Sequence, residues 1–107
     1  MQLLTEKIKR ALPPLYSTED IPTDQKKIVV KFFNPIGVGT WEVYEGSKNV
    51  EGDWLFFGRV DLGYDGAEWG YFSLSELQSV RLPMGLGIER DICVNPHLHD
   101  EWAAMDA

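Results

Sequence analysis

Apolar residues near the start of the chain recur at the spacing of a helix. The pattern predicts a short helix over Thr5–Leu12, in which Thr5 caps the first free amides and Glu6 suits the positive end of the helix dipole. The helix ends at Pro13, because a residue that precedes a proline avoids the helical region. Its apolar stripe consists of Leu4, Ile8, Ala11, Leu12 and Leu15.

Four runs rich in β-branched and aromatic residues follow, and turn residues separate them. The connections between the runs are too short to hold crossover helices, so the sequence predicts an antiparallel meander. The Asp65–Gly66 pair is typical of a hairpin turn. The four runs are Lys27–Phe33, Thr40–Glu45, Trp54–Leu62 and Trp69–Leu74.

The stretch behind the fourth run predicts a second helix and a fifth strand. Ser73 and Glu76 have the spacing of a capping box, in which each side chain bonds the backbone amide of the other residue. After a glycine-containing loop, Ile88–Val94 predicts a strand. The polar tail has room for one helical turn around Trp102. Three residues of the helix would face the sheet, namely Leu74, Leu77 and Val80.

Together these elements predict a single α+β domain. We expect a twisted antiparallel meander sheet of four or five strands, with two short helices packed mainly on one face. Residues 1–16 would carry the N-terminal helix, residues 27–94 the sheet with its inserted helix near 73–80, and residues 95–107 a polar tail. Eleven of the 13 aromatic residues lie between Phe32 and Phe72, so the second face is either covered by loops or presents an aromatic patch.

The net charge of −7 is unevenly distributed along the chain. Residues 1–31 sum to +2 (six bases, four acids) and residues 32–107 to −9 (four bases, 13 acids). An acidic body disfavours direct nucleic-acid binding and suits either solubility or a basic protein partner. The candidate acidic surface consists of Glu42, Glu45, Glu51, Asp53, Asp61, Asp65 and Glu68.

Three features of the sequence favour a cytoplasmic location. Cys93 is the single cysteine, which fits a reducing environment. No apolar run approaches the length of a membrane span, and the first residues mix acids and bases unlike a signal peptide. We therefore expect a cytoplasmic protein without a membrane partner.

Two glycine-containing stretches do not qualify as phosphate loops. The stretch Pro83–Gly87 lacks the Gly-Lys-Ser/Thr ending that holds phosphate and magnesium. The stretch Gly37–Gly39 leads into a strand, so no helix dipole awaits a pyrophosphate. We expect turns at both places, no cofactor and no small-molecule substrate.

The sequence Glu-Arg-Asp at 89–91 is the best candidate for a polar site. Strand alternation puts Glu89 and Asp91 on one face and Arg90 on the other. Two adjacent carboxylates could act as acid and base, but no nucleophile or histidine is specified nearby. The alternative is an ion-paired strand, in which Arg90 and Arg81 meet acids such as Glu76 or Glu68. The candidate set is Glu89, Arg90, Asp91, Arg81 and Glu68.

The end of the chain offers a weak candidate metal site. His97, His99 and Asp100, with Cys93 upstream, carry the atom types that zinc prefers. Their spacing is not a standard zinc pattern, and two solvated histidines in a polar tail are the simpler interpretation. We expect no metal.

Exposed aromatic residues could form an interaction surface. Tyrosine is favoured at interfaces, so a groove for a peptide is one interpretation. Stacking of single-stranded bases is the alternative, but such platforms interleave basic residues with the rings, and in the four predicted runs only Lys31 and Arg59 lie close to aromatic residues. The candidate surface consists of Tyr16, Trp41, Tyr44, Tyr64 and Tyr71.

Five segments resemble an uncharacterised bacterial domain-of-unknown-function family of about 100 residues. The segments are "LLTEKIKRALPPLYSTED", "VKFFNP", "TWEVYE", "WLFFGRVDLGY" and "EWGYFSLSELQSVRLPMGLGIERD". Members of this family are commonly carried on plasmids and integrative conjugative elements, and the family supplies no catalytic residue. The resemblance therefore implies an accessory protein of a mobile genetic element.

The sequence as a whole predicts a non-enzymatic protein that acts through a protein–protein contact. One specific version is an acidic DNA mimic that inhibits a restriction, CRISPR or other defence protein. The alternatives are a nucleic-acid accessory protein that uses the aromatic sheet and the basic N-terminal segment, and a small metal-dependent enzyme.

Overall fold

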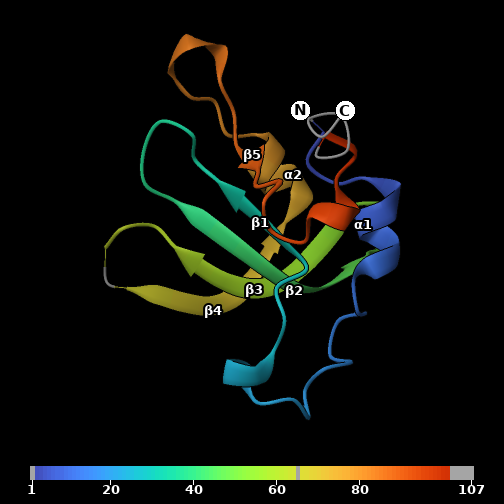
Figure 1. Ribbon diagram of the computed structural model, residues 1–107. Helices are drawn as coiled ribbons and strands as arrows, with labels where there is room; N and C mark the ends of the chain where they lie inside the picture. Colours follow the sequence, from blue (N-terminus) through green and yellow to red (C-terminus); the bar gives the residue numbers. More distant parts are fainter. Residues whose placement is uncertain (1, 65, 102–107) are drawn as a thin grey trace.

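The computed structural model describes residues 2–64 and 66–101, in which five strands form one open antiparallel sheet (Figure 1). The strand order is β4-β3-β2-β1-β5. Asp65 and the predicted helical turn around Trp102 lie outside the described residues. With η for a short 3-10 helix, the elements are α1 (Glu6–Ala11), η1 (Thr23–Gln25), β1 (Val30–Phe33), β2 (Thr40–Lys48), β3 (Trp54–Asp61), β4 (Ala67–Ser73), α2 (Leu74–Gln78), η2 (Pro83–Gly85), β5 (Glu89–Arg90) and η3 (Pro96–Leu98).

The predicted α+β meander is confirmed for the first four strands, and the fifth strand differs from the prediction. β5 contains two residues instead of Ile88–Val94, and it pairs with β1 on the far side of the sheet. It ends at Arg90 because the Asp91 side chain accepts a hydrogen bond of 2.9 Å from the Cys93 amide, which turns the backbone away.

Both helices begin at the predicted caps. The Thr5 hydroxyl accepts from the Ile8 amide at 3.3 Å, and the Ser73 hydroxyl accepts from the Glu76 amide at 3.2 Å. Of the two capping-box bonds predicted for α2, the described structure contains the one to Ser73. Both helices are short, so their stability depends on packing against the sheet. No helix of the described residues is long and apolar enough to cross a membrane.

The hydrophobic core lies on one face of the sheet. The register places Phe32, Phe56 and Phe72 on this face, with ring centroids 6.1 and 5.7 Å apart along the row. Ile8 of α1 and Leu77 of α2 belong to the same buried cluster. Each such side chain contributes about 1.5–3 kcal/mol through burial. Both helices therefore pack against the same hydrophobic core, as the sequence predicted.

A buried arginine joins the two ends of the chain at the edge of this core. The Arg90 side chain donates from Nε to the Gln2 carbonyl at 3.2 Å and from Nη1 to His99 Nδ1 at 2.7 Å, and it pairs with Glu101. The predicted partners Glu76 and Glu68 were wrong, because Arg90 faces the core side of β5 and meets the C-terminal segment there.

His99 is buried, which corrects the prediction of a solvated side chain. Its Nε2 donates to the Val94 carbonyl at 2.8 Å, so Nδ1 accepts from Arg90 and the ring is neutral. Burial holds the pKa of His99 below its usual value, and the charge of Arg90 acts in the same direction; the Val94 bond and the charges of Glu101 and Asp91 oppose them.

A bulge in β2 decides what the second face of the sheet presents. The β2–β3 register shifts between Val43 and Glu45, so Tyr44 is an extra residue and Tyr44 and Glu45 both face away from the core. Gly58 lies opposite Val43. A Cβ atom at Gly58 would stand 1.7 Å from the Glu42 carbonyl oxygen, so only glycine fits beside the bulge.

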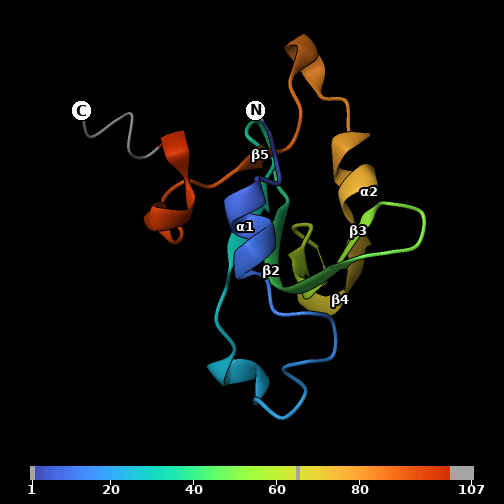
Figure 2. The same cartoon turned by 90° about the vertical axis from the view of Figure 1, so that its right-hand side faces the viewer.

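The segment between α1 and β1, residues 13–27, packs beside this bulge. In both orientations it projects beyond the strands before the chain enters β1 (Figure 2). The Gly46 amide donates to the Pro13 carbonyl at 2.9 Å, and the Leu15 amide donates to the Ser47 hydroxyl at 3.0 Å. These bonds attach the start of the segment to β2.

We expect Gly58→Ala to lower the free energy of unfolding by about 3 kcal/mol, because the added methyl group meets backbone that cannot move without opening the β2–β3 ladder. Gly70→Ala is the matched control, since a Cβ there has no described atom within 4 Å. It should leave stability unchanged or slightly raised. Urea denaturation of both variants tests this prediction, and equal losses would contradict it.

The buried His99 should make stability depend on pH. Its folded pKa lies below the unfolded value of about 6.5, so its contribution is complete above about pH 6.5 and is lost as the pH falls, by at most about 1.4 kcal/mol per pH unit. His99→Gln, which keeps one donor and one acceptor, should flatten this slope.

The control for this pH experiment is His97→Gln, because His97 is exposed. It should retain the wild-type slope in urea titrations between about pH 5 and about pH 8. If the stability of His99→Gln depended on pH as steeply as that of the wild type, a group other than His99 would be responsible and the prediction would be wrong.

Candidate interaction groove

The carboxylate of Glu45 holds residues 16–18 against the second face of the sheet. Glu45 is 3% exposed. Its Oε1 accepts from the Tyr16 amide at 2.9 Å, and its Oε2 accepts from the Thr18 amide at 3.0 Å and from the Thr18 hydroxyl. The bulge therefore supplies an acceptor for backbone groups that belong to no helix or strand.

Lys26 completes this cluster from the other end of the segment. Its Nζ donates to the Thr18 carbonyl at 2.5 Å and lies 3.9 Å from Glu45 Oε2. Burial alone would raise the pKa of Glu45. The hydrogen bonds from Thr18 and Tyr16 and the charge of Lys26 outweigh it and hold that pKa below its usual value. Glu45 is therefore ionised at neutral pH, and its charge orders residues 16–26.

Tyr16 has a strained backbone. Its φ angle is +70°, in the left-handed region that a bulky aromatic residue rarely adopts. Such a conformation costs about 1–3 kcal/mol and persists where neighbouring structure enforces it. Glu45 does so by accepting from the Tyr16 amide. The ring is 59% exposed, so the strain is not offset by burial in the core.

Aromatic rings form a continuous row across the second face. The ring centroids of Tyr16 and Tyr71 are 6.3 Å apart, those of Tyr71 and Phe57 5.2 Å, and those of Phe57 and Trp69 5.7 Å. Tyr44 follows Trp69 at 4.9 Å. Tyr71 is 52% and Trp69 37% exposed. The row therefore combines the buried Tyr44 and the half-buried Phe57, which fix its position, with exposed rings that can contact a ligand.

A pocket of about 340 Å³ lies between this row and residues 16–26. We call it the tyrosine groove. Its charged lining residues are Glu19, Glu45 and Lys26, which leave one negative charge in excess. Burial and the neighbouring Tyr16 raise the pKa of Tyr71, and the charges of Glu45 and Glu19 raise it further. Its lining consists of Tyr16, Glu19, Ile21, Pro22, Thr23, Lys26, Glu45, Phe57 and Tyr71.

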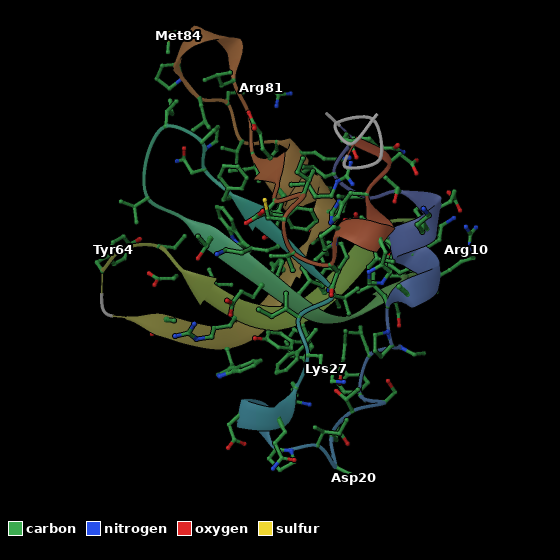
Figure 3. All side chains as sticks on the ribbon, viewed as in Figure 1. Arg10, Asp20, Lys27, Tyr64, Arg81 and Met84 are labelled. Carbon is green, nitrogen blue, oxygen red and sulfur yellow. The ribbon has the colours of Figure 1, made fainter. Side chains whose placement is uncertain are left out.

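The predicted aromatic surface is brought together in part. Tyr16 and Tyr71 meet in the groove, and Tyr44 is buried beside it. Trp41 packs against the core on the other face, and Tyr64 lies in the β3–β4 connection, far from the segment that carries Asp20 and Lys27 (Figure 3).

Two members of the row, Phe57 and Trp69, were missed by the sequence analysis. Strand alternation places the side chain of Phe57 on the face of the sheet opposite to that of its neighbour Phe56, which belongs to the core. The signal that could have found both residues is the β3–β4 register, which pairs Phe57 with Tyr71 and places Trp69 beside them on the same face.

The five residues of the predicted polar site come together only in part. Glu89, Arg90 and Asp91 line a pocket of about 690 Å³ with Lys31, between β5 and residues 34–39. Arg90 faces the core, Arg81 donates to the Gln78 carbonyl at 2.7 Å, and Glu68 lies on β4. The arrangement gives two carboxylates beside a lysine but no assembled acid–base site.

The predicted acidic surface is divided among separate structural roles. Glu42 forms an ion pair of 3.5 Å with Arg59 and accepts from the Tyr44 hydroxyl, and burial together with this carboxylate raises the pKa of Tyr44 to about 12. Asp53 accepts from the Ser75 hydroxyl at 2.6 Å. The Ser75 bond holds the pKa of Asp53 below its usual value.

Of the remaining acidic positions, Asp61 and Glu68 lie in β3 and β4, and Glu51 lies in the β2–β3 connection. Asp61 accepts from the Gly63 amide at 2.9 Å, Glu51 and Glu68 are exposed, and Asp65 lies outside the described residues. Four of the seven positions are thus occupied by contacts within the chain, counting Glu42, Glu45, Asp53 and Asp61.

The histidines of the tail lie in different environments. His99 is buried against Arg90, whereas His97 and Asp100 are exposed, and Asp100 is 3.5 Å from Lys7 Nζ. Among the residues that the structure describes, no group of three His, Cys, Asp or Glu side chains is placed to hold a metal ion.

A family model described as "Protein of unknown function (DUF2958)" matches residues 3–104. The predicted resemblance to a domain-of-unknown-function family is confirmed, and the mobile-element setting stays a prediction. No curated protein and no solved structure matches the chain.

We expect Glu45→Gln to lower the free energy of unfolding by about 2 kcal/mol, because an amide group cannot accept from all the donors that surround the carboxylate. Since the folded pKa of Glu45 is depressed, its stabilisation is present above about pH 4.5 and is lost as the pH falls through the folded value. The difference between the variant and the wild type should therefore shrink in acid.

Glu51→Gln is the matched control, because Glu51 is exposed. Urea denaturation near pH 7 and below pH 4 would measure both variants. A loss in Glu51→Gln as large as that in Glu45→Gln would contradict a specific role for the buried carboxylate.

Proposed function

We propose that this chain, which belongs to the family described as Protein of unknown function (DUF2958), is a non-enzymatic protein that binds a basic protein partner through the tyrosine groove. The conformation of Tyr16 is the main observation that supports this proposal. Its backbone is strained while its ring stays exposed beside Tyr71, so the fold bears a conformational cost without gaining core packing. Contact of that ring with another molecule accounts for both features.

The charge of the groove favours a cationic ligand. Glu19 is exposed at the rim and Glu45 lies in the wall. The charges of Glu45 and Glu19, which add to burial and to the Tyr16 contact in raising the pKa of Tyr71, also attract a lysine or arginine side chain. A cation over a tyrosine ring gains about 0.5–1 kcal/mol where exposed and ~2 kcal/mol where desolvated.

The chemistry of the rings favours a protein over a nucleic acid. Tyrosine and tryptophan are enriched among the residues that dominate binding energy at protein interfaces. Base stacking would need basic residues around the rings, but Arg59 is paired with Glu42 and Lys26 is buried against Glu45. In the basic N-terminal segment, Lys7 and Lys9 also form ion pairs, with Asp100 and Glu6.

The accessory role for a mobile element, with a defence protein as its target, is a finer version of the same proposal. It rests on the family resemblance and on the acidic character of residues 32–107. We base the contact on the groove rather than on an array of DNA-like charge, because four of the seven candidate acids serve contacts within the chain.

We expect Tyr16→Gly to weaken partner binding by about 30-fold, the equivalent of about 2 kcal/mol, without loss of stability. Glycine relieves the positive φ, so the free energy of unfolding should stay equal or rise. Affinity purification from the native host with quantitative mass spectrometry measures binding, and Tyr71→Ala should behave as Tyr16→Gly does.

Tyr64→Ala is the matched control, because Tyr64 is exposed on a different loop (Figure 3). It should capture the same basic protein as the wild type. Equal capture by all variants, or no specific protein captured by the wild type, would refute the proposed function.

A further inference from the structure

The two edge strands of the sheet differ in length, and the longer one, β4, is the better candidate for pairing with another chain. At one edge stands β5, which has two residues. At the other stands β4, which has seven residues and, among the described strands, one neighbour, β3. The outer N–H and C=O groups of β4 therefore form a long row without a strand beside it, and such a row is a template for pairing with another chain.

β4 has few of the devices that protect edge strands, and its one charged residue is Glu68. Proteins block such edges with charged side chains, above all lysine, with proline or with a bulge. The sequence of β4, AEWGYFS, contains neither lysine nor proline, and its described register with β3 runs without a shift. A Cβ at Gly70 would have no described atom within 4 Å, so one face of the strand is open at its middle.

The stretch around β4 is anionic. From Val60 to Val80 the sequence has four acids, Asp61, Asp65, Glu68 and Glu76, and no lysine or arginine. A second copy of this chain would bring the same negative stretch against the first. A segment with lysine or arginine would be attracted instead.

The edge is continuous with the tyrosine groove. Trp69 and Tyr71 belong to β4, and both side chains stand on the second face in the aromatic row. In a strand added beside β4, alternate side chains would point to this face and lie next to the two rings. The edge would thus supply backbone hydrogen bonds, and the rings and glutamates would supply selectivity.

We infer that the partner binds as a sixth strand: an extended segment rich in lysine or arginine pairs with β4 and places alternate side chains over Trp69 and Tyr71. This inference rests on the proposed function and specifies its partner. It commits to a protein segment in the β conformation rather than to a helix or a loop.

Proline variants test the strand pairing. Consecutive N–H groups of a strand point to opposite sides, so Ala67→Pro and Gly70→Pro remove groups of opposite direction. The variant that removes the outward group keeps the β3–β4 ladder and should unfold like the wild type, yet it should lose partner capture by at least about tenfold. Urea denaturation identifies that variant, and affinity purification from the native host measures its capture.

A photo-crosslinking residue at Gly70, with Val50 as the control position, provides a second measurement that does not depend on proline. Val50 is fully exposed in the β2–β3 connection. Position 70 should crosslink to a lysine- or arginine-rich segment of the captured protein, and position 50 should not. A crosslink from position 70 to a second copy of this chain would overturn the inference.

The outcomes separate the two proposals. If the wild type and the stable proline variant capture the partner equally while Tyr71→Ala loses it, the groove binds the partner and the strand pairing is wrong. If the wild type captures nothing specific, both proposals fail.

Discussion

The second face of this sheet depends on one extra residue in β2. Because the bulge inserts Tyr44, the side chain of Glu45 also turns away from the core and reaches the segment that follows α1. Gly58 makes this possible, since any side chain there would meet the Glu42 carbonyl. The clamp on residues 16–18, the strained backbone of Tyr16 and the position of its ring against Tyr71 all follow from that single displacement.

The energetics of this region differ from those of the core. The core is stabilised by ordinary burial of phenylalanine and aliphatic side chains. The groove instead contains a buried lysine–glutamate pair, whose desolvation offsets much of its attraction, and a left-handed tyrosine that costs further free energy. These features order an exposed aromatic surface rather than the core. That imbalance is why we assign recognition to the groove.

Local patterns in the sequence were sufficient for much of the fold. Helical spacing with Thr5 and Ser73 as caps located both helices, and alternating strands with short connections gave the meander. The length of β5 and the partners of Arg90 were not predictable, because both are set by long-range contacts with the C-terminal segment. The groove was predicted only in part, for the same reason: its rings meet only after the bulge and the β3–β4 register are fixed.

Amide hydrogen exchange at Tyr16 and Thr18 is the most direct test of the Glu45 clamp. Both amides lie outside helices and strands, so their only protection should come from the buried carboxylate. We predict slow exchange of both in the wild-type protein and fast exchange of both when Glu45 is replaced by glutamine, with the amides of β1 unaffected. Fast exchange at Tyr16 and Thr18 in the wild type, or slow exchange that survives the replacement, would contradict the account.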